Sequence, residues 1–126
     1  MSDIVDFEDE SLDDGNLFDC EYTSIDAVIN AVTVFTGAKL QPTENGDRVL
    51  IAYGEGVQRS AFFTDSKKLR DVVLKEGRTF PFRAMIKVVS YGNMYGFRFF
   101  SPSSEVTDQD RMNFENYKRY KRKSYR

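Results

Sequence analysis

Aromatic and basic residues recur together along this chain, a combination that suits a surface for nucleic acid. Cations contact phosphates, and aromatic faces stack on bases with about 1–3 kcal/mol per stack. We expect an interface from residues on the outer faces, ends and turns of the strands proposed below: Phe35, Lys39, Arg48, Tyr53, Arg59, Phe63, Lys87, Tyr91, Tyr95 and Arg98. A buried position is the simpler alternative for Phe35 and Phe63, whereas tyrosine favours a wet edge.

The C-terminal segment NYKRYKRKSYR, residues 116–126, is a second candidate for contact with phosphates. It holds six cations, three tyrosines and no acidic residue. A block of like charge is typical of a disordered interaction arm. Its candidate phosphate contacts are Lys118, Arg119, Lys121, Arg122 and Lys123. The alternative is a solvated tail that serves only solubility.

The N-terminal segment has the opposite charge. The first 26 residues carry ten acidic residues and no lysine or arginine, so the rest of the chain has a net charge of +8. Acidic residues among isolated apolar ones cannot repay the entropy of ordering, so we expect residues 1–22 to be disordered. A replication or recombination protein could dock on Phe7, Leu12, Leu17 and Phe18. Alternatively, the segment aids solubility, or folds back on the basic surface when DNA is absent.

Several kinds of chemistry lack the residues they need. The chain has one cysteine, Cys20, and no histidine, which excludes an internal disulfide, a Cys/His metal site and a Ser-His or Cys-His nucleophile. We therefore expect no enzyme, no metal and no cofactor. The chain also has no apolar run of about 18 residues and begins with an acidic segment, so we expect no membrane span. The expected location is the cytoplasm, that of the host if the protein is viral.

Hydrophobic periodicity predicts five strands and one helix. The strand over residues 32–41 alternates, with Val32, Val34, Ala38 and Leu40 expected on its apolar face. Asn45-Gly46 is a strong hairpin signal. The period changes to that of a helix over residues 65–77, with Leu69, Val72 and Val73 on one stripe. The remaining strands are expected over residues 48–53, 58–64, 80–91 and 94–100.

Five antiparallel strands with a helix between the third and fourth predict a mainly β fold, the five-stranded OB-fold barrel. The expected domain covers residues 23–104, between the acidic segment 1–22 and a basic aromatic tail, residues 105–126. An open α+β sandwich with the helix on one face is the alternative.

The runs AFFTDSKKLRDVV and FPFRAMIKVVSYGNMYGFRFF resemble the small OB-fold single-stranded-DNA-binding proteins of bacteriophages. In those proteins, a strand ending in aromatics and a Thr or Ser leads into a Ser-Lys helix, an apolar-basic strand and an aromatic hairpin. The similarity covers about residues 32–102. It implies a protein that coats single-stranded DNA in phage or mobile-element replication or recombination. One departure is that bacterial-type members carry their acidic, partner-recruiting tail at the C-terminus.

A protein-interaction module is the alternative function, such as an inhibitor of a host DNA-processing enzyme. Its acidic N-terminal segment would imitate DNA, and its aromatic residues would form a protein interface. Salt dependence separates the two functions, because single-stranded-DNA affinity falls by about 0.7 log units per log unit of salt for each phosphate neutralised. The sequence leaves open DNA or RNA preference, and an oligomer formed through an exposed strand edge.

Overall fold

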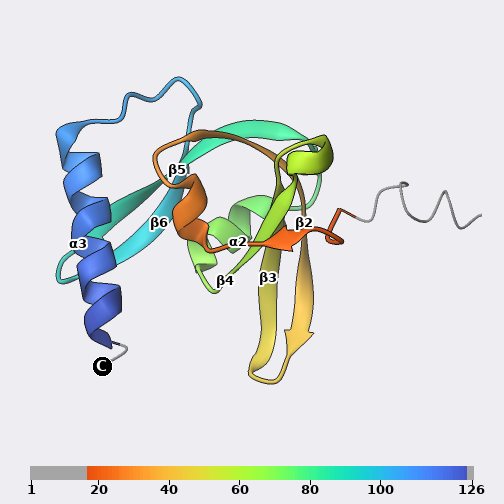
Figure 1. Cartoon of the computed structure of the whole chain (residues 1–126), viewed down its shortest axis with the longest axis horizontal. Coiled ribbons are helices and arrows are strands. Elements are labelled where there is room, and N and C mark those ends of the chain that lie inside the picture. The colour runs from red at the N-terminus through yellow and green to blue at the C-terminus, as the bar shows by residue number, and fades with distance from the viewer. Residues whose placement is uncertain (1–16, 125–126) are drawn as a thin grey trace, which may run out of the picture.

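The computed structural model describes residues 17–124, which form one mixed sheet, two α-helices and two 3-10 turns (Figure 1). The elements in chain order are β1 Glu21–Tyr22, η1 Ile25–Val28, β2 Val32–Thr43, β3 Gly46–Tyr53, η2 Gly56–Gln58, β4 Ser60–Thr64, α2 Lys67–Val73, β5 Phe82–Tyr91, β6 Met94–Phe100 and α3 Asp108–Ser124. The five strands and the helix expected from the sequence are therefore present, in the expected order. No helix within residues 17–124 is both long and apolar enough to cross a bilayer.

The sheet is open rather than a closed five-stranded barrel. Its six strands follow the order β1-β4-β3-β2-β5-β6, so β4 and β6, which would have to pair to close it, are not neighbours. The free edge of β4 is taken by β1, which runs parallel to it with Glu21 opposite Ser60 and Tyr22 opposite Ala61. This additional strand gives β4 a different partner at the position where a barrel would close.

Strand β2 bends the sheet around the core, because its two halves pair with different strands. Residues Val32–Phe35 pair with β5, and residues from Phe35 to Thr43 pair with β3. A register shift lies between Phe35 and Gly37. The core then lies between the two halves of the sheet, where Phe35, Ile51 and Phe62 are fully buried.

The predicted inner face of β2 is wrong. Thr33 and Phe35 are buried, whereas Val32 and Leu40 are 51% and 41% exposed. Phe35 packs edge-on against Phe99, with the ring centroids 5.2 Å apart. The register shift after Phe35 returns Ala38 to the core side, which simple alternation along the strand does not anticipate.

Helix α2 closes one side of the core. The Ser66 hydroxyl caps it by accepting a hydrogen bond from the Leu69 amide, at 3.3 Å. Leu69 and Val73 are buried in the core, as their spacing predicted. The helix ends at Val73, and Gly77 follows it with a φ of +85°. A residue without Cβ suits this left-handed conformation.

The basic C-terminal segment is a helix and not a disordered arm. Helix α3 packs along the outer face of β5 (Figure 1). Asp108 and Asp110 lie in its first turn, and the cations follow toward its C-terminal end, an order that complements the helix dipole. Phe114 and Tyr117 pack against the core cluster, so this segment contributes side chains to the packing of the core.

Part of the acidic segment also has a defined structure. Residues 17–22, which we name the N-terminal strap, lie against the outer face of β3 and β4 and end in strand β1. The strap side chains that pack on this face are Leu17, Phe18 and Cys20. The prediction of disorder through residue 22 is therefore wrong for the strap, while Phe7 and Leu12 lie outside the described residues.

Candidate nucleic-acid interface

Four of the predicted site residues, Arg48, Phe63, Tyr95 and Lys121, line one cleft of about 530 Å³. We name it the β4–β6 cleft, because it lies beside these two strands, which do not pair with each other. It receives side chains from β3, β4, β6, the start of α2 and helix α3. Its charged and aromatic lining residues are Arg48, Phe63, Asp65, Lys67, Lys68, Tyr95, Phe97, Tyr117 and Lys121. Four cations and one carboxylate face four aromatic rings, which is a combination suited to an anionic polymer with stacking bases.

Arg48 and Phe63 form the first wall through the pairing of β3 with β4. The Arg48 guanidinium lies over the Phe63 ring, 5.2 Å from its centroid. Its Nε donates a hydrogen bond to Asp65 Oδ1 at 2.9 Å. The Arg48 side chain is 36% exposed and that of Asp65 is 73% exposed, so the pair is accessible to solvent. Solvent screens such a pair, which leaves the guanidinium able to contact a second anion.

The start of α2 places two lysines on the rim of the cleft. Lys67 and Lys68 follow the Ser66 cap directly. Lys67 Nζ lies 3.2 Å from Asp71 Oδ2, with side chains 85% and 60% exposed. Neither lysine was among the residues predicted for the interface. A signal that could have found them is their position at the start of the helix that directly follows the aromatic strand β4.

Helix α3 and strand β6 form the opposite wall. The rings of Phe97 and Tyr117 pack edge-on with centroids 5.2 Å apart. Lys121 Nζ lies 3.3 Å from Asp26 Oδ2 and 5.6 Å from the Tyr117 ring centroid. Burial opposes the charge on Lys121, but Tyr117 and Asp26 outweigh it, so the pKa of this ammonium group lies above its ordinary value. Lys121 therefore stays charged within the cleft.

Two predicted contacts, Phe35 and Lys87, are wrong because both side chains are buried. Phe35 is part of the core, as described above. Lys87 is 5% exposed, because α3 covers the outer face of β5. Its Nζ donates to the Glu105 carbonyl oxygen at 2.7 Å and to Asp110 Oδ2 at 2.8 Å. Lys87 therefore forms an internal ion pair with Asp110 in place of the phosphate contact that we expected.

The remaining strand residues of the prediction do not line the β4–β6 cleft. Lys39 lies over the ring of Phe18 in the strap, 4.6 Å from its centroid. The Tyr53 hydroxyl shares a 2.9 Å hydrogen bond with the Thr23 hydroxyl, and its ring packs against the core. The side chains of Tyr91 and Arg98 are exposed on the β5–β6 hairpin and on β6.

The basic residues of α3 have separate surroundings. Lys118 lies over the Phe114 ring at 4.5 Å and pairs with Glu115 at 3.1 Å. Arg119 donates a hydrogen bond to Asn116. The side chains of Arg122 and Lys123 lie outside the described part of the structure. Lys121 is thus the member of the predicted basic group that lines the cleft.

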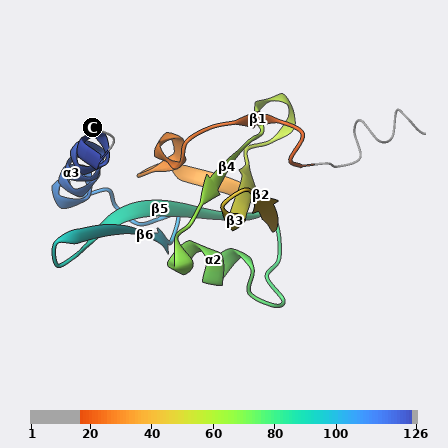
Figure 2. The same ribbon diagram turned by 90° about the horizontal axis from the view of Figure 1, so that it is seen from below.

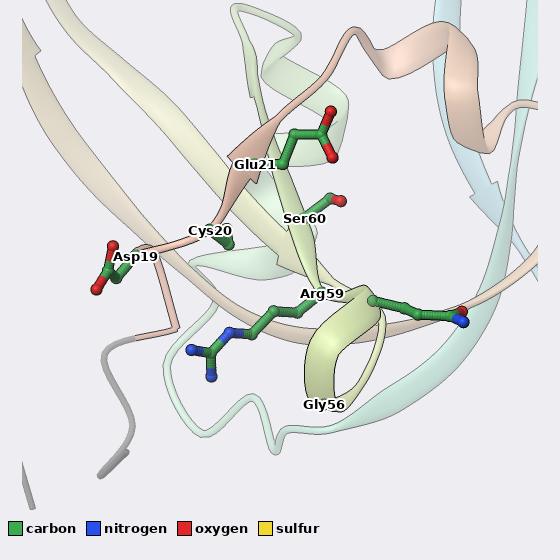
Figure 3. Close-up of a pocket in the computed structure, with 7 residues that line it drawn as sticks. Asp19, Cys20, Glu21, Gly56, Arg59 and Ser60 are labelled. Atoms are coloured by element: carbon green, nitrogen blue, oxygen red, sulfur yellow. The ribbon is translucent and has the colours of Figure 1, made fainter. Parts of the chain in front are cut away.

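Arg59, the last of the predicted strand residues, lines a second hollow of about 800 Å³ between the strap and η2. Figure 3 shows Asp19 and Cys20 near Arg59, with Glu21 pointing away. Burial raises the pKa of the Cys20 thiol, and Arg59 partly offsets this effect. A raised pKa disfavours the reactive thiolate. Among the described residues, no group of His, Cys, Asp or Glu could hold a metal ion.

A family model of a domain of unknown function, DUF8468, matches residues 19–100. The chain belongs to the DUF8468 family. The matched DUF8468 region extends from the strap through β6, so it contains the outer face of β3 and β4 and most of the cleft. Helix α3, which supplies the Tyr117 and Lys121 wall, lies outside that match. No curated protein and no solved structure shows significant similarity to this DUF8468 chain.

Proposed function

We propose that this protein binds single-stranded DNA in the β4–β6 cleft and on the adjoining outer face of β3 and β4. The observation that carries the proposal is the meeting of cations and aromatic rings from five elements in one cleft. A flexible single strand can place phosphates against the cations and unstacked bases against the rings. Duplex DNA keeps its bases stacked and offers only the phosphates.

The strand arrangement supports the same proposal. The neighbours β4-β3-β2-β5-β6, with α2 between β4 and β5, have the order of an OB-fold barrel opened between its third and fifth strands. OB-folds bind oligonucleotides on the face of their second and third strands and in the loops after strands one and four. Here those strands are β3 and β4, which carry Arg48 and Phe63. The proposed role is the coating of single-stranded DNA during phage or mobile-element replication or recombination.

The direct test is fluorescence anisotropy of a labelled oligo-dT, competed with unlabelled duplex and with unlabelled RNA at several salt concentrations. We expect preference for the single strand and a steep decrease of affinity with salt. Equal competition by duplex DNA, or no binding at low salt, would contradict the proposal. Absence of binding would instead favour the protein-interaction module, in which the acidic segment imitates DNA.

Two lysines at opposite ends of α2 provide a matched pair of variants. Lys68 lies on the rim of the cleft, and Lys75 lies beyond the other end of the helix; both are exposed. The substitution Lys68→Ala should reduce the slope of log affinity against log salt by about 0.7, the value for one phosphate contact. Lys75→Ala should leave the slope unchanged. Equal slopes for the two variants would place the phosphates elsewhere.

A further inference from the structure

The outer face of β3 and β4, opposite the core, is covered by the N-terminal strap. Leu50, Ala52 and Ala61 on this face are at most 1% exposed. The strap residues that pack over them are Leu17, Phe18 and Cys20. In Figure 2, β1 and α2 lie on opposite sides of β3 and β4. The proposed binding face is therefore occupied by a segment of the same chain.

The aromatic rings of the strap contact a cation and an aromatic ring, the two kinds of side chain that bound single-stranded DNA would contact. The Phe18 ring lies under the Lys39 ammonium, 4.6 Å from it. The Tyr22 ring meets the Phe63 ring with centroids 5.7 Å apart and planes inclined by 57°. Phe63 also lines the β4–β6 cleft. Tyr22 thus occupies space beside a ring on which a base would stack.

The strap is attached by a two-residue strand and by the packing of three side chains, and it carries negative charge. Strand β1 has two residues, and the Thr23 amide adds one hydrogen bond to the Ala61 carbonyl at 2.8 Å. The Tyr22 side chain remains 48% exposed. The strap contains Asp19 and Glu21, and seven further acidic residues precede it in the sequence. Segments with few buried contacts open at low cost in free energy.

We propose that the N-terminal strap is an intramolecular competitor that single-stranded DNA must displace from the outer face of β3 and β4. The aromatic strap residues take the place of bases, and the Asp19 carboxylate takes the place of a phosphate near Arg59. This inference rests on the proposed function, because the displaced surface is the proposed DNA site. The apparent affinity for DNA is then the intrinsic affinity reduced by the fraction of molecules with an open strap.

Cys20, the only cysteine of the chain, reports strap displacement without any substitution. It is partly buried in the strap, and burial raises the pKa of its thiol, so a thiol reagent should label it slowly at pH 7. Saturating oligo-dT should increase the labelling rate about three- to tenfold if the strap is closed in most free molecules. Duplex DNA of the same length should not change the rate.

A substitution in the strap gives an independent measurement. Phe18→Ala should tighten oligo-dT binding about three- to tenfold, because the closed state loses contacts and the open state gains population. The matched control is Met112→Ala, which removes an apolar side chain that is 55% exposed on α3. It should leave the affinity unchanged. Circular dichroism melting of both variants checks that the fold persists.

The outcomes separate this inference from the proposed function. DNA binding with unchanged or slower Cys20 labelling would overturn the strap competitor and leave the DNA site intact. Tighter oligo-dT binding by Phe18→Ala than by the unmodified protein, together with faster Cys20 labelling when DNA binds, would support both. If neither protein binds oligo-dT, the proposed function fails, and the inference fails with it. The labelling experiment decides the matter even if Phe18→Ala does not fold.

Discussion

Helix α3 and the N-terminal strap both come from terminal segments of strong charge, yet they are held to the sheet in different ways. Helix α3 is anchored by the ion pair between Lys87 and Asp110, whose side chains are 6% and 15% exposed. The Asn113 side chain adds a hydrogen bond to the buried Val88 carbonyl at 3.3 Å. The strap has a two-residue strand and a few apolar contacts. A buried polar anchor fixes α3 to the sheet, whereas a short strand and apolar contacts hold the strap, which is the segment we propose to open.

Breaking the anchor of α3 should have the largest effect. Lys87→Met leaves Asp110 buried without its partner, which should lower the free energy of unfolding by about 3–5 kcal/mol. Urea denaturation followed by circular dichroism measures this loss. The double variant Lys87→Met with Asp110→Leu should recover most of it, because an apolar pair of similar size avoids the unpaired charge. A single variant as stable as the unmodified protein would show that the ion pair does not hold α3.

A substitution of Phe63, which contacts the strap through Tyr22, tests whether DNA binds on the strap side of the sheet or on the outer face of α3. Phe63→Leu keeps an apolar side chain beside Arg48 and Tyr22 but removes the stacking face. We expect a loss of about 1–3 kcal/mol in oligo-dT affinity, the contribution of one stacked base. Tyr120→Leu on α3, whose ring is 55% exposed outside the cleft, is the control and should leave affinity unchanged. The reverse result would place the DNA on the outer face of α3.

Acid should weaken the attachment of α3 to the sheet. The apolar contacts of the strap contain no group that titrates in acid and should not change. Burial disfavours charge on Asp110, yet hydrogen bonds from Lys87 and Thr107 outweigh it and lower its pKa. A lowered pKa means that this stability is present above the unfolded value of about 3.9 and is lost as the pH falls through the folded value. Urea midpoints should therefore decrease more steeply as the pH falls below about 4 than those of the Lys87→Met/Asp110→Leu variant. This is the smallest of the three expected effects, because protonated Asp110 can still accept a hydrogen bond.

The local signals of the sequence determined the elements. Asn45-Gly46 predicted the β2–β3 hairpin, and the spacing of Leu69 and Val73 predicted α2. These features act between near neighbours in the chain, so they operate without knowledge of the fold. The types of the recurring cations and aromatics likewise led to the prediction of a nucleic-acid surface, which stays a prediction.

Only the tertiary structure decided which side chains are accessible. Thr33 and Phe35 face the core in place of the predicted Val32. The register shift after Phe35 returns Ala38 to the core side, and α3 buries Lys87 by covering β5. The block of cations indicated a solvated arm, although Phe114 and Tyr117 pack that segment on the core. Tertiary packing likewise assembles the β4–β6 cleft from Arg48 to Lys121 and places the strap on its adjoining face. Such contacts join residues far apart in sequence, and burial depends on what covers a surface, which local propensity does not encode.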